Sequence, residues 1–293
     1  MYSKKNKGVS SARNYALNVF ESIQQKPDFI CFIDSDDIVK ETFVEIFVKE
    51  LINHKADYAV CGYDEFDKCG VVLRNVRKTK DEELDNLQIL EHYYAVKRYG
   101  YGKGKLYKTY DATYSWGLCN KCIRYNILKK YRFDEHLTNC EDMKLFLSLS
   151  GDLTKGIVIS NRLYLYRLRL SSIVHSDENE MKVHLNNYIV LRDALNDNYP
   201  RTTKEILIIC LCWVCYVCFY KSIMCKTKNS RYFFYELKKY MEICKKEKIE
   251  RYLDSRLFRI KYGYLSNFIY HKYKILKKHI KFFLSKKKCN YFL

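Results

Sequence analysis

The chain has 293 residues, of which 48% are hydrophobic, and a formal net charge of +19. This composition is that of a globular protein and excludes a disordered or fibrous chain. The length suits one domain with an extension, or two small domains. Residues 201–293 hold 23 Lys and Arg against 6 Asp and Glu, a net of +17, which leaves +2 for residues 1–200. A basic tail indicates an anionic partner, either a membrane surface or nucleic acid, with solubility as the plainer alternative.

The cysteines indicate a reducing compartment. There are 13 of them, an odd number, in a sequence without a secretory signal, which favours free thiols in the cytoplasm. Cys119 and Cys122 form one CxxC, without a second pair at zinc-ribbon spacing. Cysteines at 212, 215 and 218 recur every third residue in an apolar run, where small buried side chains explain them better than an iron–sulfur site.

Residues 10–63 alternate between helical and extended patterns. Apolar residues at helical spacing predict a helix that is capped by Ser10 or Ser11 and runs to about Gln25. The apolar run Phe29–Ile33 predicts a strand buried on both faces, as in parallel sheets. A helix over 41–53 and a strand over 57–63 follow. This alternation is typical of α/β proteins.

The remaining sequence predicts further elements and then a helical tail. We expect helices over 81–97, 123–131 and 141–150, a loop over 98–112, and strands over 155–159 and 162–168. From about residue 178 the pattern is helical throughout, so we place one domain at 1–176 and a second region at 177–293. The apolar run Ile206–Tyr220 has 15 residues, whereas a membrane span needs about 20. We therefore favour a buried or interfacial helix there.

An acidic cluster follows the first predicted strand. Asp34, Asp36 and Asp37 place three carboxylates within four residues. Ligands of open α/β sheets bind beyond the carboxyl ends of strands, and such carboxylates repel one another unless a cation or a set of donors offsets the cost. Hard cations such as Mg²⁺ or Mn²⁺ suit these oxygens. The alternative is a turn in which Asp37 caps the next helix.

Three sequence blocks carry a resemblance to a known family. They are Asn6-x-Gly8-x-Ser10-x-Ala12-Arg13-Asn14 before the Asp34-Ser35-Asp36-Asp37 strand end, then Trp116, Lys121, Phe133-Asp134 and Glu141-Asp142, then Leu163–Arg167 with Ser171 and Ser172. In kind and order they resemble the family 2 glycosyltransferases of the GT-A fold, over about residues 5 to 175. The resemblance implies a Rossmann-like, mostly parallel α/β sheet within 1–176, followed by an all-helical basic extension.

The family pattern has two strands before the first block, and the second of them ends in acidic residues that hold the nucleotide base. Here the block begins at Asn6. We therefore expect an N-terminally incomplete sheet and donor pocket, which a wrongly chosen start codon or a truncated gene would explain.

The resemblance also implies a reaction. We expect an inverting transferase that moves a sugar from a nucleotide donor, UDP-linked in our expectation, to a polysaccharide or lipid-linked acceptor in surface polysaccharide synthesis. Asp142 matches the general base, which takes the proton of the acceptor hydroxyl in a single displacement. Glu141 beside it and Trp116, which can stack on a sugar face, are the expected acceptor contacts. The alternatives are an acidic helix start and a half-buried core Trp.

The donor side is expected to hold Mn²⁺ or Mg²⁺. Asp36 matches the direct metal ligand and Asp34 the residue near ribose and metal, whereas His175 is a further candidate because imidazole suits Mn²⁺. We expect four more residues to bind the donor or shape its loop: Asn6, Gly8, Arg13 and Arg167. Their alternatives are structural: helix capping for the aspartates, exposed arginines on a helix and at a strand end, and a solvated histidine.

The tail interleaves lysines with aromatics, as at Tyr232–Tyr235 and Lys272-Tyr273-Lys274. This pattern suits an anionic bilayer, and also nucleic acid. We favour the bilayer and expect no nucleic-acid partner, because no nucleic-acid motif accompanies the pattern. The expected location is cytoplasmic, peripheral at the inner face of the cell membrane. Two other functions stay open: a non-catalytic transferase remnant that binds membranes or partner enzymes, and, more distantly, a basic nucleic-acid-binding protein.

Overall fold

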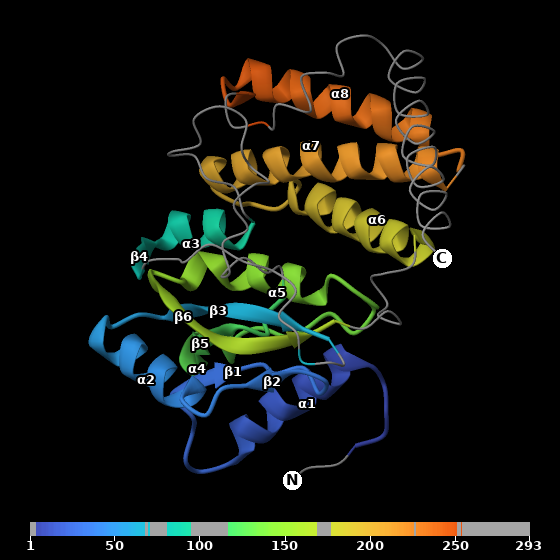
Figure 1. The fold of residues 1–293 in the computed structure, drawn as a ribbon. Helices are drawn as coiled ribbons and strands as arrows, with labels where there is room; N and C mark the ends of the chain where they lie inside the picture. The colour runs from blue at the N-terminus through green and yellow to red at the C-terminus, as the bar shows by residue number, and fades with distance from the viewer. Residues whose placement is uncertain are drawn as a thin grey trace, which may run out of the picture. The chain divides into compact units, whose positions relative to one another are not determined.

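The computed structural model describes residues 4–67, 70, 81–94, 117–168, 177–225, 227–250 and 253. The chain divides into two compact units, which are described separately. Within the described residues, the first unit comprises 4–94, 117–168 and Pro200–Ile206, and the second comprises 177–199 and the residues from 207 onward (Figure 1). The predicted boundary at 176/177 falls at the end of a segment, 169–176, that lies outside the described residues.

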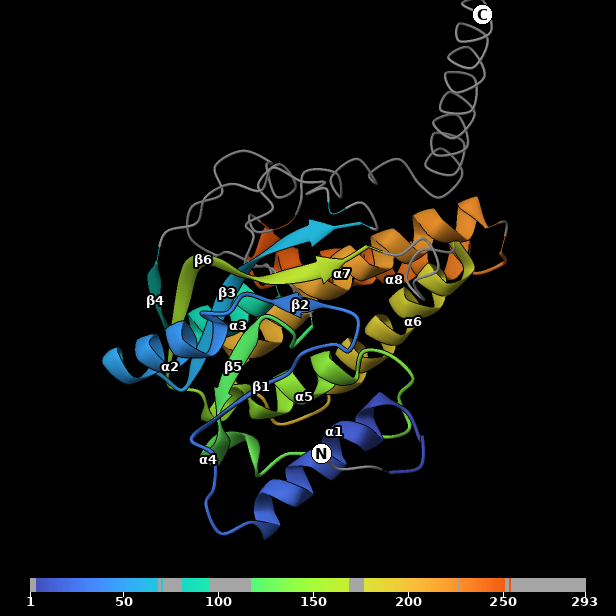
Figure 2. The ribbon, with the colours of Figure 1, turned by 60° about the horizontal axis from the view of Figure 1, so that its bottom comes forward.

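A six-stranded mixed sheet forms the centre of the first unit (Figures 1 and 2). Its strands are β1 (Phe29–Cys31), β2 (Ile38–Val39), β3 (Tyr58–Phe66), β4 (Glu82–Asp85), β5 (Lys121–Arg124) and β6 (Lys155–Arg167). The order is β1-β5-β3-β6-β2, and β4 also pairs with β6. The β3–β6 pair is parallel, and the other described pairs are antiparallel.

The α/β class is confirmed, whereas the prediction of a mostly parallel sheet is wrong. The four predicted strands correspond to β1, β3 and β6, because 155–159 and 162–168 form one strand, and these three do run in one direction. However, β5 lies between β1 and β3 and is antiparallel to both. The sequence predicts a helix over 123–131, but only Tyr125–Leu128 (α4) is helical there. Cys122 and Ile123 are fully buried in the sheet, so tertiary packing overrides the helical pattern of this short segment.

Helices cover both faces of the sheet. On one face, α2 (Phe43–Asn53) buries Phe43, Phe47 and Leu51 against alternate residues of β3 and β6. On the other face lie α3 (Asn86–Tyr93) and α5 (Glu141–Leu149), where Tyr93 stacks on Phe146 with ring centroids 3.7 Å apart. Side chains of a strand alternate between faces, so β3 is buried on both. The predicted helices at 41–53 and 141–150 are confirmed.

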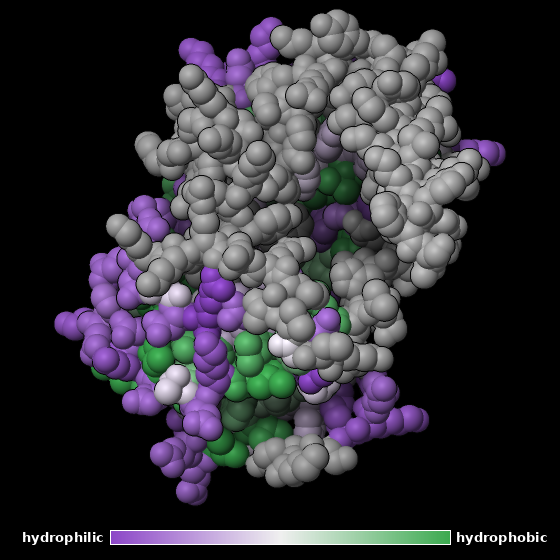
Figure 3. Space-filling model, in the orientation of Figure 1, coloured by the Kyte–Doolittle hydropathy of each residue, from purple (hydrophilic) through white to green (hydrophobic). Residues whose placement is uncertain are grey.

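The first predicted strand is less buried than expected. It covers Phe29–Cys31 and, among the described residues, pairs on one side only, with β5. Ile30 is buried, but Ile33 is 49% exposed, because an edge strand has neighbours on one side. Other large apolar side chains of this unit are also exposed, namely Val9, Ile38, Val44 and Ile52. Apolar surface accordingly gathers in the lower half of Figure 3.

Helix α1 (Val9–Ser22) differs from its prediction in cap and face. Its N-cap is Gly8, whereas Ser10 and Ser11 lie inside the helix and are buried. Asn14 and Leu17 complete the buried face. Arg13 and Asn14 of the first block bond from this helix to other segments of the unit.

The described part of the second unit is helical, as predicted, and contains α6 (Asp177–Ala194), α7 (Arg201–Met224) from residue 207 onward, and α8 (Ser230–Lys246). Aromatic pairs join the helices: Tyr188 with Phe233, and Phe219 with Phe234. The Tyr188 hydroxyl also donates to Glu236 at 2.7 Å.

Helix α7 contains the apolar run. An 18-residue window of it has a mean hydropathy of 2.1, and 72% of this window is buried. Helix α7 is long and apolar enough to cross a membrane. Buried core helices of soluble proteins can have the same length and hydropathy.

Candidate active site

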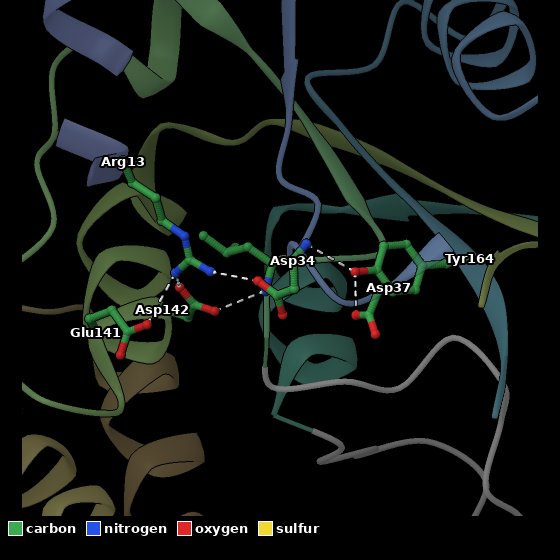
Figure 4. A network of polar contacts seen from close by, with 7 residues as sticks. Arg13, Asp34, Asp37, Glu141, Asp142 and Tyr164 are labelled. Carbon is green, nitrogen blue, oxygen red and sulfur yellow. Dashed lines mark hydrogen bonds and ion pairs between the residues drawn. The ribbon is translucent and has the colours of Figure 1, made fainter. Parts of the chain in front are cut away.

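Arg13 lies at the centre of a cluster of carboxylates (Figure 4). Its Nη1 donates to Glu141 Oε1 at 3.1 Å and to Asp142 Oδ1, and its Nη2 donates to Asp34 Oδ1 at 3.2 Å. The Arg13 side chain is only 12% exposed. Its guanidinium carbon lies 5.6 Å and 5.2 Å from the ring centres of Phe32 and Phe133. One cation thus joins α1, the end of β1 and the start of α5.

Glu141 and Asp142 form the first turn of α5, where the helix dipole favours negative charge. The Leu118 N–H donates to Asp142 Oδ2 at 3.2 Å. Burial raises the pKa of the Asp142 carboxyl to about 6, although the Arg13 charge and the Leu118 hydrogen bond oppose this shift. The Glu141 charge raises the pKa further. A carboxylate with such a pKa is largely ionised at neutral pH and is a stronger base than an exposed aspartate.

Asp37 is bound within the protein. Its Oδ1 accepts the Arg167 N–H at 2.8 Å, and its Oδ2 accepts the Tyr164 hydroxyl. Tyr164 in turn accepts the Asp34 N–H at 3.2 Å, so β6 fixes the turn that follows β1. Burial raises the pKa of the Asp37 carboxyl. The suggestion that Asp37 caps the next helix is wrong, because the N-cap of α2 is Thr42.

Asp34 and Asp36 are the carboxylates suited to a cation. The Asp34 side chain is 43% exposed and gives one oxygen to Arg13, and Asp36 is half-buried. Within the described ranges, no three His, Cys, Asp or Glu side chains cluster in a way that would hold a metal ion. Proteins nevertheless often bind Mg²⁺ through one or two carboxylates, with diphosphate oxygens and water as the other ligands. The oxygens of Asp34 and Asp36 fit such a site. His175 lies outside the described residues.

Arg167 is hydrogen-bonded to the backbone of the acidic turn. Its Nε donates to the Asp36 carbonyl at 2.7 Å, and its guanidinium lies over the Phe66 ring at 4.5 Å. These contacts give Arg167 a structural role, whereas its predicted contact with the donor stays a prediction.

Asn6 and Gly8 shape the exposed loop before α1. Asn6 Oδ1 accepts the Gly8 N–H at 3.0 Å, and Gly8 has a φ of 89°, which favours glycine. The predicted acceptor residue Trp116 lies outside the described residues. The structure therefore brings Arg13, Asp34, Glu141 and Asp142 together and leaves Asn6 and Gly8 on the loop that leads into α1.

Asn14 is a site residue to which the sequence analysis gave no role. Its side-chain amide donates to the Phe133 carbonyl at 2.9 Å and accepts the Phe133 N–H at 2.8 Å. These paired bonds fix α1 against the segment that leads to α5, and hence Arg13 against Asp142. The available signal was its position at the end of the first block, one residue after Arg13.

A pocket of about 510 Å³ lies elsewhere in the first unit. Its lining comprises Asp28, Phe29, Val48, Leu51, Ile52, Lys55 and Arg124. It contains none of the predicted site residues, so it is distinct from the carboxylate cluster.

The first unit has the fold of a GT-A-type domain. Helices cover both faces of its mixed sheet, an acidic turn follows β1, and two carboxylates lie in the first turn of α5. Residues 1–125 match the profile of glycosyl transferase family 2. This match and the relatives below support a family 2 glycosyltransferase domain in the first unit.

Two curated relatives are glycosyltransferase GlyA of Streptococcus pneumoniae and the minor teichoic acid biosynthesis protein GgaB of Bacillus subtilis. The chain is 27% identical to GlyA over 173 residues and 28% identical to GgaB over 170 residues, in each case 58% of this chain. It spans only 22% of GlyA and 16% of GgaB.

The crystal structure of S. aureus TarS 1–349 in complex with UDP-GlcNAc is a structural neighbour. It aligns with a TM-score of 0.58 and 16% identity, and the match covers 94% of this chain and 74% of the TarS chain. At this identity the likeness shows a shared fold.

Proposed function

We propose that the chain is an inverting glycosyltransferase that moves a sugar from a nucleotide-sugar donor to a glycan or lipid-linked acceptor. The observation that carries the proposal is the contact of Arg13 with both Asp34 and Asp142. A residue of the donor side and the base candidate thereby lie within reach of one guanidinium. A displacement reaction needs this closeness, because the base must reach the acceptor hydroxyl while the diphosphate leaves.

The proposed donor is a UDP-sugar, since the TarS structure that shares the fold is a complex with UDP-GlcNAc. Asp34 and Asp36, with His175 as a further candidate, would hold Mn²⁺ or Mg²⁺. A divalent cation at this place supplies positive charge for the diphosphate leaving group. Arg13 adds a fixed cation beside the same turn, and Arg167, Asn6 and Gly8 are the further donor-side candidates.

Asp142 is the proposed general base, and its environment supports this role. With a pKa of about 6 it is still largely ionised at neutral pH, and it is more basic than an exposed aspartate, which suits it to take a proton from a hydroxyl in the transition state. Leu118 and Arg13 orient the carboxylate. Glu141 and Trp116 are the proposed acceptor contacts.

The proposed acceptor is a cell-surface polymer or its lipid-linked precursor. One relative is named for teichoic acid synthesis and another as a glycosyltransferase. An acceptor at the inner face of the cell membrane would also explain the basic helical unit. The exposed face of α8 carries Arg231, Lys238, Lys245 and Lys246 together with Tyr232 and Tyr235, and these two tyrosines are 48% and 54% exposed. We therefore propose peripheral attachment to anionic lipid, with the enzyme on the cytoplasmic side.

The second candidate function is a non-catalytic remnant that binds membranes or partner enzymes. Among the described residues β1 pairs on one side only and Ile33 after it is exposed, so this edge offers apolar surface to a partner.

UDP release by the full chain separates the two functions. The chain is incubated with a panel of UDP-sugars, UDP-GlcNAc first, with Mn²⁺ and a wall-polymer fraction as acceptor. Mn²⁺-dependent UDP release that requires the acceptor is the expected result. Absence of both donor binding and UDP release across the panel would overturn the enzyme and leave the remnant.

A further inference from the structure

One peptide group connects a buried lysine to the proposed base. The Leu118 N–H donates to Asp142 Oδ2 at 3.2 Å, and the Gly117 carbonyl of the same peptide accepts Lys121 Nζ at 2.7 Å. The two hydrogen bonds leave the peptide in opposite directions. The Gly117–Leu118 peptide therefore lies between the ammonium of Lys121 and the carboxylate of Asp142.

Lys121 is held in a closed environment. Its side chain is 1% exposed, its Nζ also donates to Asn120 Oδ1 at 2.7 Å, and the ammonium lies 5.5 Å from the centre of the Tyr93 ring. Burying an ammonium is costly unless hydrogen bonds and π faces replace its water. Loss of hydration lowers the pKa of Lys121 to about 8, and the nearby charge of Asp142 opposes this shift. The lysine is thus a cation at neutral pH.

We propose that Lys121 is a positioning residue for Asp142. By binding the Gly117 carbonyl, the ammonium fixes the rotation of the peptide and polarises it, so that the Leu118 N–H is a stronger and better-aimed donor to Asp142 Oδ2. Hydrogen bonds in such a chain reinforce one another. A carboxylate offers about four lone-pair sites. Leu118 and Arg13 each use one on Asp142, so the remaining lone pairs can accept the hydrogen bond of the acceptor hydroxyl. The inference rests on the proposed role of Asp142.

The kinetic test compares two Lys121 variants, and a control variant described below, with the wild-type chain. Lys121→Met keeps the length of the side chain and removes every donor, whereas Lys121→Gln keeps an amide donor. A positioned base contributes about 100- to 10,000-fold, and we expect loss of its orientation to lower kcat about tenfold in Lys121→Met. The donor KM should stay unchanged, and Lys121→Gln should recover part of the loss.

Asn86→Ala is the matched control for stability. Asn86 donates to the carbonyls of Ser150 and Leu153, beyond the other end of α5 from Asp142, and so its loss disturbs the same layer without touching the proposed base. It should lower the free energy of unfolding and leave kcat unchanged. Equal losses of kcat in Lys121→Met and Asn86→Ala at equal stability would overturn the positioning role.

A spectroscopic reporter makes the test independent of turnover. Gly117–Leu118 is the only Gly-Leu step in the sequence, so labelling glycine with ¹³C at the carbonyl and leucine with ¹⁵N gives one carbonyl–amide cross-peak for this peptide. We expect Lys121→Met to shift the Gly117 carbonyl carbon and also to move the Leu118 amide proton upfield. Lys121→Gln should shift both less, and it replaces the Met variant if that one does not fold.

The NMR outcome separates this inference from the proposed function. A coupled shift of carbonyl and amide supports the Lys121–peptide–Asp142 connection even if the wild-type chain transfers no sugar. A carbonyl shift without any amide shift overturns the inference, as does an unmoved cross-peak, whatever the transfer assay shows.

Discussion

Arg13 and Asp142 form an ion pair across 129 residues of sequence, between α1 and the first turn of α5. The Arg13 charge opposes the effect of burial on the Asp142 pKa and so helps to keep the carboxylate ionised. The same guanidinium binds Asp34. One cation is thus shared by Asp34, which we propose to lie on the donor side, and Asp142, the proposed base.

Arg13→Met should strongly destabilise the first unit. It leaves Glu141, Asp142 and Asp34 close together without their shared cation, and breaking a buried ion pair costs about 3–5 kcal/mol. Denaturant unfolding monitored by fluorescence measures the change. Lys130→Gln is the control, because it removes an exposed pair with Asp152 that contributes about 1 kcal/mol or less. Equal effects of the two variants would show that the Arg13 cluster is energetically unimportant.

Transferase activity should depend on the ionisation of Asp142. Its pKa is about 6, so kcat/KM should rise with pH up to about pH 6 and then level off, because only the ionised base accepts a proton. Glu141 raises the pKa of Asp142, and therefore Glu141→Gln should move this limb to lower pH. The measurement is the pH profile of kcat/KM for both proteins. An acidic limb at the same pH in both would exclude the assigned coupling.

The sequence predicted most helices and strands of the first unit. It also singled out Arg13, Asp34, Glu141 and Asp142, which the structure brings together. Long periodic segments such as α2, α5 and β3 follow their patterns, because their apolar faces are buried. The short strand β5 could not be predicted, because its four residues are extended only through pairing with β1 and β3. The shared position of Asp34 and Asp142 was implied by the family resemblance, whereas the bridging role of Arg13 and the fixing role of Asn14 required coordinates. No side-chain pattern signals Leu118, since it contributes a backbone N–H.

Asp36 and Asp37 should differ sharply when each is replaced by alanine. Asp37→Ala leaves the Tyr164 hydroxyl and the Arg167 N–H without their acceptor, which costs about 1–3 kcal/mol per group. Asp36→Ala should leave the free energy of unfolding nearer to wild type and weaken Mn²⁺-dependent binding of UDP-GlcNAc. Calorimetric titration with and without Mn²⁺, beside urea unfolding, measures both effects. Donor binding that is equally strong in Asp36→Ala would remove Asp36 from the metal site.

The chain should bind anionic vesicles in a salt-dependent manner. Each basic residue near an anionic surface contributes about 1 kcal/mol, so replacing Lys238, Lys245 and Lys246 on α8 by Gln should weaken binding by orders of magnitude. Co-sedimentation with neutral and anionic vesicles at low and high salt measures this. Exposed Lys129 and Lys130 of the first unit, both changed to Gln, are the control. Equal binding to neutral and anionic vesicles would contradict an electrostatic attachment, and preference for duplex DNA over vesicles would favour the nucleic-acid function.

Asp142→Asn tests the central claim most directly, because asparagine keeps the shape of the side chain and cannot accept the proton. Calorimetry measures binding of the UDP-sugar, and UDP release in the presence of acceptor measures turnover. We predict that the donor binds with an affinity close to that of the wild-type chain, while turnover falls about 100- to 10,000-fold, the contribution of a positioned base. Turnover equal to that of the wild-type chain would contradict the assignment of Asp142 as the general base.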